Sequence, residues 1–144
     1  MWTCPNCQRT FKNENQAHGC HRIDKMDFFT KRPALLWELY KKVVEEARAF
    51  GEFREEAVPP DVIFFKTKST FLAVKVKKDH LDITFFLDHV EDVPPVSKYL
   101  QTSKRRVVHI VPVDSAEEIN VQLLEWMRAS YELITNAQTG TINP

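Results

Sequence analysis

Five residues of the kinds that bind transition metals lie within the first 21 positions of the chain: Cys4, Cys7, His18, Cys20 and His21. Cys4 and Cys7 have the C-x2-C spacing that places two thiolates on one side of a tight turn, and the second group follows after ten residues. Four thiolate and imidazole ligands close a tetrahedron around zinc and leave no position open for water. The cluster therefore predicts a structural zinc ion rather than a catalytic one.

The fourth ligand of this zinc site is ambiguous, because five candidates compete for four positions. His18 and His21 are three apart, a spacing that puts both side chains on one helical face. We expect Cys20 to be the fourth ligand, since a thiolate binds zinc well and a spare cysteine would be an exposed reactive thiol. The expected ligands are Cys4, Cys7, His18 and Cys20, with His21 as the alternative to Cys20.

The composition of the 144 residues is that of a folded protein. Hydrophobic residues make up 43%, and 20 Lys+Arg balance 20 Asp+Glu, which supports a packed core and excludes disorder of the whole chain. No apolar run approaches the roughly 18 residues of a membrane helix, and the N-terminus lacks the layout of a signal peptide. We expect a cytoplasmic protein that does not enter the membrane.

The elements that follow the metal cluster have the patterns of an α+β domain. Apolar residues recur every three or four positions over Pro33–Phe50 and from Ser115 to about Thr135, which predicts two helices. Between them, short alternating runs with brief links predict an antiparallel sheet of four or five strands flanked by the two helices. The runs are Phe53–Val58, Asp61–Thr67, Thr70–Lys77, His80–Leu87 and Arg105–Val113, and Asp88–Lys104 is interpreted as a long loop.

Three segments follow from this organisation. We expect a small zinc-binding module over residues 1–24, the α+β domain over 25–135 and a flexible tail over 136–144. The first segment is too short to fold alone and depends on its metal.

A set of residues near the N-terminus resembles the small zinc module that precedes the bacterial domain-of-unknown-function family 5655: Trp2, Cys4, Cys7, Arg9, Phe11, Gln16, His18 and Cys20. Later segments are similar to the family itself, among them Phe71–Val74, Lys77–Asp79 and the C-terminal helix around Trp126. The resemblance implies an α+β domain and favours Cys20 over His21 as the fourth ligand. It implies no activity, because the family has no established function.

The alternation of the strands predicts one face that is basic and aromatic. Over Thr70–Lys77 we expect Leu72, Val74 and Val76 to face the core and the residues between them to face outward. The candidate ligand-binding residues are Lys66, Lys68, Phe71, Lys75, Lys77, Phe86 and His109.

This face supports two hypotheses of function. Lysines beside exposed phenylalanines can follow phosphates while the rings stack on bases, which favours a nucleic-acid-binding module. Alternatively, Phe71 and Phe86 mark the interface of a protein-interaction or homodimerising domain, and the lysines solvate its rim. In both cases we expect a binding module rather than an enzyme, with no catalytic residues.

Other chemistry has weaker support in the sequence. Three glycines in the whole chain exclude a glycine-rich nucleotide loop. The acidic clusters around His80 and His89 contain side chains that can bind a divalent metal ion. We favour the interpretation that they are solvated charged residues at a strand end and in a loop. His109 is a candidate binding or acid–base residue, and the competing interpretation is a hydrogen-bonded histidine on a half-buried sheet face.

Overall fold

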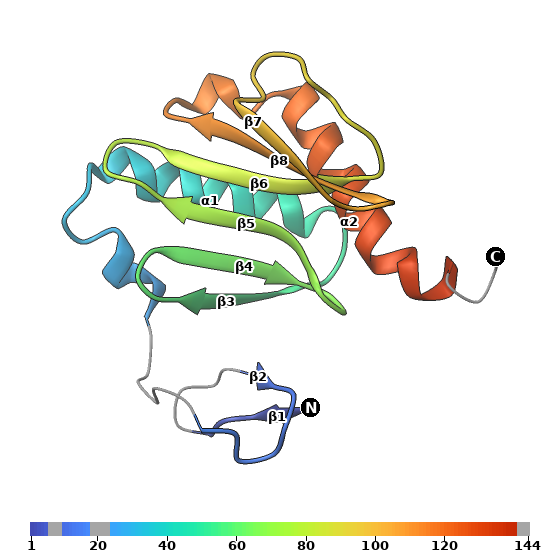
Figure 1. The fold of residues 1–144 in the computed structure, drawn as a ribbon. Coiled ribbons are helices and arrows are strands. Elements are labelled where there is room, and N and C mark those ends of the chain that lie inside the picture. The colour runs from blue at the N-terminus through green and yellow to red at the C-terminus, as the bar shows by residue number, and fades with distance from the viewer. Residues whose placement is uncertain (6–9, 18–23, 141–144) are drawn as a thin grey trace.

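The structure is a computed structural model that describes residues 1–5, 10–17 and 24–140 (Figure 1). At the N-terminus, β1 (Trp2–Thr3) and β2 (Thr10–Phe11) form a short antiparallel hairpin. In the described residues that follow, six strands lie between helices α1 (Ala34–Arg48) and α2 (Val121–Gly140). The strands are β3 (Arg54–Val58), β4 (Val62–Lys66), β5 (Thr70–Val76), β6 (Leu81–Leu87), β7 (Lys98–Ser103) and β8 (Arg106–Val113).

The six strands form one antiparallel sheet in the order β3-β4-β5-β6-β8-β7, and both helices lie on the same face of it. Tyr40 of α1 contacts the ring of Phe65, and Trp126 of α2 stacks on Phe85. Phe65 and Phe85 are the two register neighbours of Leu72, so their side chains share one face. Figure 1 shows the two helices behind the sheet. The α+β class with an antiparallel sheet is therefore confirmed.

The core fills the space between this face and the two helices. Along β6, Leu81, Ile83, Phe85 and Leu87 are buried and the residues between them are half-buried, as the alternation predicts. The helices contribute side chains at helical spacing, so each presents one buried stripe. Those side chains are Leu36, Leu39, Tyr40, Val43 and Ala47 of α1, and Leu123, Met127, Ser130 and Ile134 of α2.

The main sheet has six strands, not four or five, because β7 lies inside the segment that we interpreted as a loop. Every residue of β7 is exposed, since the strand is at the edge of the sheet beside β8. An edge strand of this kind buries neither face, so it lacks the alternation by which a half-buried strand is recognised. The long loop is thereby reduced to residues 88–97.

Helix α2 begins later and ends later than predicted. Glu118 accepts hydrogen bonds from the backbone N–H groups of Asp114 and Ser115. Ser115 and Glu118 form a capping box, but it caps only a short 3-10 helix, η2 (Ala116–Glu118). The α-helix starts after Asn120, whose side chain accepts from the N–H of Leu123. At its other end α2 continues to Gly140, into the segment that we predicted as a tail.

Candidate functional site

The face of the sheet opposite the helices carries half-buried apolar side chains. Phe64, Ala73, Thr84 and Ile110 are register neighbours on four adjacent strands, so they form a row across this face. At the β7 edge the set continues to Leu100, which is 66% exposed. We call this surface the open face, and its apolar residues are Val62, Phe64, Ala73, Phe86, Leu100, Val108, Ile110 and Pro112.

Charged side chains on the open face include two cross-strand pairs of opposite sign, together with the cations Arg54 and Lys98. The Nζ of Lys66 lies 2.8 Å from a carboxylate oxygen of Glu56 on the neighbouring strand β3. Lys75 of β5 is the register neighbour of Asp82 of β6. Because cross-strand neighbours on one face lie close together, each pair is largely neutral at a distance. The open face thus carries apolar side chains and both signs of charge, with more basic than acidic side chains because Arg54 and Lys98 also lie on it.

Phe71 lies in the core and not on the outer face, which corrects the prediction that it is an exposed stacking residue. The register of β4 and β5 shifts between Phe65 and Lys66, and Phe71 is left without a partner on β4. In this β-bulge Phe71 and the following Leu72 are both fully buried. The Phe71 ring packs edge-on against Tyr131 of α2, with centroids 4.9 Å apart. Its ring is therefore inaccessible to a base.

The other predicted binding residues do not form one patch. Lys66, Lys75 and Phe86 lie on the open face, and Phe86 also packs partly against the core. Lys68 is exposed in the turn before β5, whereas Lys77 is half-buried just after β5. The length of a seven-residue strand therefore separates these two lysines.

His109 is a core residue, which corrects the prediction that it contacts a ligand. It is fully buried, and its ring stacks on Phe85 with a centroid distance of 5.3 Å. The Nε2 atom accepts the N–H of Glu91 at 2.9 Å, and Nδ1 donates to the carbonyl of Val107 at 3.0 Å. Burial lowers the pKa of His109, in keeping with a neutral imidazole that uses both nitrogens. No ring nitrogen is left to bind a ligand.

The two acidic clusters are hydrogen-bonded turns. His89 lies between Asp88, at 2.7 Å from Nδ1, and Glu91, at 3.0 Å from Nε2. These hydrogen bonds raise the pKa of His89, and the bond to His89 lowers the pKa of Asp88. His80 is placed similarly beside Asp79 and Asp82. In the part of the chain that the structure describes, no group of three acidic, histidine or cysteine side chains is arranged to hold a metal.

Of the expected zinc ligands, only Cys4 belongs to the described residues. It is buried and directly follows β1, whose register with β2 pairs Trp2 with Phe11 and Thr3 with Thr10. Cys7, His18, Cys20 and His21 lie outside the described residues.

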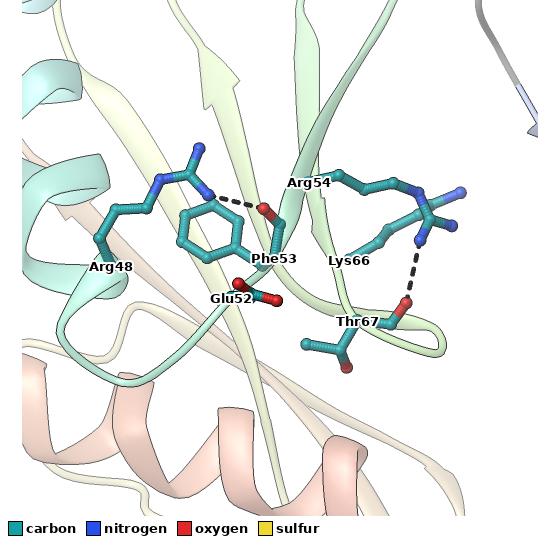
Figure 2. Close-up of a pocket in the computed structure, with 6 residues that line it drawn as sticks. All are labelled: Arg48, Glu52, Phe53, Arg54, Lys66 and Thr67. Carbon is teal, nitrogen blue, oxygen red and sulfur yellow. Dashed lines mark hydrogen bonds between the residues drawn. The ribbon is translucent and has the colours of Figure 1, made fainter.

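A pocket that the sequence did not reveal lies at the corner of the sheet, where α1 ends and β3 begins (Figure 2). Its volume is about 460 Å³. We call it the corner pocket, and it is lined by Arg48, Glu52, Phe53, Arg54, Lys66 and Thr67. Three of these six residues are cations that come from three different elements, so no local sequence motif could have indicated the site.

The open face and the two helices behind it define a two-layer α+β domain. Residues 25–134 match the family described as a domain of unknown function (DUF5655). Because the match covers more than half of the chain, the protein belongs to this family. The comparisons with curated proteins and with solved structures found no match. Within the described residues, no helix combines the length and the hydrophobicity needed to cross a membrane.

Proposed function

We propose that the protein is a zinc-stabilised interaction module whose open face packs against the open face of a second copy of the chain. The observation that carries this proposal is the row of Phe64, Ala73, Thr84 and Ile110, which lies on the face of the sheet away from both helices (Figure 1). Sheets with one apolar, uncovered face normally pack that face against another layer.

The size of the open face supports an interface. Five spacings of about 4.8 Å between six strands make the sheet roughly 24 Å wide, and six residues at about 3.3 Å make it roughly 20 Å long. The flat area of the face is then about 480 Å², and the accessible surface is larger because side chains project from it. The flat area is that of the whole face, charged side chains included, and it is of the same order as the roughly 800 Å² per partner that a standard interface buries.

The charge pattern favours a second copy as the occupant. Glu56 with Lys66 and Lys75 with Asp82 place both signs around the apolar row. When two identical faces meet about a two-fold axis, a surface that carries both signs can oppose each charge with its complement.

The zinc ion in this proposal is bound by Cys4, Cys7, His18 and Cys20, with His21 as the alternative to Cys20. Support comes from the β1–β2 hairpin, whose connecting segment contains both cysteines of the C-x2-C motif. The C-x2-C spacing is typical of structural zinc sites. Reduced cysteines that bind metal also suit the cytoplasmic location predicted from the sequence.

The oligomeric state tests the interface. Sedimentation equilibrium should find a dimer, and Phe64→Lys together with Ile110→Lys should convert it to a monomer, because the paired copies would bury four unpaired ammonium groups. Val121→Lys is the matched control, since Val121 is 70% exposed at the start of α2, away from the open face. A wild-type monomer at high concentration would refute the proposal, and so would a dimer that the double substitution leaves intact. Unfolding by urea shows that each variant is folded.

Binding of nucleic acid along the lysines of the sheet has less support, because Phe71 is buried and Lys66 is paired with Glu56.

A further inference from the structure

Two cations of the corner pocket are held in an arrangement that costs stability. Arg54 of β3 and Lys66 of β4 are register neighbours, so their side chains leave the same face of the sheet side by side. Like charges in directly opposed cross-strand positions repel each other. The Nζ of Lys66 turns to Glu56, whereas no ion pair of Arg54 is found among the described residues. An anion bound beside Arg54 would relieve this repulsion.

Both arginines of the pocket donate hydrogen bonds to backbone carbonyls. Arg48 donates from Nη1 to the carbonyl of Phe53 at 2.6 Å, and Arg54 donates from Nη1 to the carbonyl of Thr67 at 3.1 Å. Figure 2 shows these two bonds on either side of the start of β3. Arg48 also contacts Glu55 at 3.2 Å. A guanidinium group has five N–H donors, so each arginine keeps donors for a ligand, and phosphate is the anion that such a fork fits best.

The pocket also contains a surface on which a flat ring can stack. The guanidinium of Arg48 lies 3.9 Å from the centroid of the Phe53 ring, and that ring stacks on Phe65 at 4.8 Å. The Arg48 side chain is 46% exposed. Bases of single-stranded nucleic acids stack on arginine planes of this kind.

We propose that the corner pocket binds a nucleotide unit of a single-stranded nucleic acid, with its phosphate at Arg54 and its base on Arg48. The volume of about 460 Å³ suits a nucleotide and is much larger than a phosphate ion needs. Lys68, exposed in the turn after β4, lies two residues beyond Lys66 and contacts a neighbouring phosphate of the same strand. The site adjoins the open face, since Lys66 lines the pocket and its Nζ also lies 5.7 Å from the centroid of the Phe64 ring.

The test uses a fluorescein-labelled, mixed-sequence 12-nucleotide DNA strand, with binding to the full-length protein measured by fluorescence anisotropy at several salt concentrations. Arg54→Gln should weaken binding about tenfold, as expected for loss of a hydrogen bond to a charged group. It should also make the slope of log affinity against log salt shallower by about 0.7. Arg128→Gln is the matched control, because it removes the same charged group from an arginine of α2 that lies outside the pocket.

A competition experiment distinguishes binding of a nucleic-acid phosphate from binding of free inorganic phosphate. Inorganic phosphate should displace the oligonucleotide only at far higher concentration than an unlabelled strand does. Equal displacement at equal phosphate concentration would overturn the nucleic-acid assignment, and so would Arg54→Gln binding as tightly as Arg128→Gln. Since neither substitution alters Phe64 or Ile110, failure here leaves the test of the dimer interface unaffected.

Discussion

The hydroxyl of Ser130 donates a hydrogen bond to the carbonyl of Phe71 at 2.5 Å and so ties α2 to the bulge in β5. The same hydroxyl accepts the N–H of Phe86 at 2.9 Å. The paired residues of β5 and β6 start next to these two groups, with Leu72 opposite Phe85. Ser130 therefore satisfies two backbone groups at the place where the ladder between these strands ends.

Ser130→Ala removes only one hydroxyl group, but it should lower the free energy of unfolding strongly. The side chain is fully buried, so its loss leaves a carbonyl and an N–H without partners, at about 1–3 kcal/mol for each unsatisfied group. Urea unfolding measures the change. Ser97→Ala is the control, because the Ser97 hydroxyl donates to the carbonyl of Ile110 in an exposed place and its loss should cost little. Equal small effects in both variants would show that Ser130 has no special role.

Gly51→Ala should also destabilise the fold, for a steric reason. Gly51 has a φ of +146°, and a Cβ atom there would overlap the hydroxyl of Tyr131. Tyr131→Phe removes that oxygen, so it should recover part of the loss when combined with Gly51→Ala. The remaining part reflects the backbone strain of alanine at this φ and the close approach of its Cβ to Cζ of the Tyr131 ring, at 3.0 Å. A double-mutant cycle from thermal unfolding gives both parts, and additive effects would contradict the predicted overlap.

The free energy of unfolding should fall as the pH decreases from about 6.5, because burial lowers the pKa of His109. The unfolded chain then binds a proton that the folded chain excludes, and this loss continues until the pH passes the folded-state pKa. His109→Gln should flatten the pH dependence in this range, as measured by urea unfolding. His89 has a raised pKa, so its contribution has the opposite sign and disappears as the pH rises through that pKa. A pH dependence unchanged by His109→Gln would disprove the assignment.

Zinc content should distinguish the two candidates for the fourth ligand. Cys20→Ala should reduce the bound metal strongly and His21→Ala should reduce it little, because only removal of a ligand deletes a metal bond. The reverse order would assign the site to the two histidines. Chelation should loosen residues 1–22, while the α+β domain keeps its cooperative unfolding transition, since that domain has its own core.

The sequence by itself determined the two long helices and five of the six strands of the main sheet, because the apolar residues of these elements recur with the period of a helix or a strand. Leu72, Val74 and Val76 face the core as that alternation predicts. The strand β7 was missed, since an exposed edge strand has no apolar period to detect.

Only the tertiary structure decided which residues reach the two candidate surfaces. A bulge of one residue in β5 reverses the direction of Phe71, and no local pattern predicts where a bulge occurs. The open face depends on the order of the strands and on both helices lying on the same side of the sheet. Phe64 and Ile110 thus lie at the two ends of one row, although they are 46 positions apart in the sequence. The corner pocket joins the end of α1, the start of β3 and the end of β4. Its chemistry arises from side chains that are distant in sequence and are brought together by packing alone.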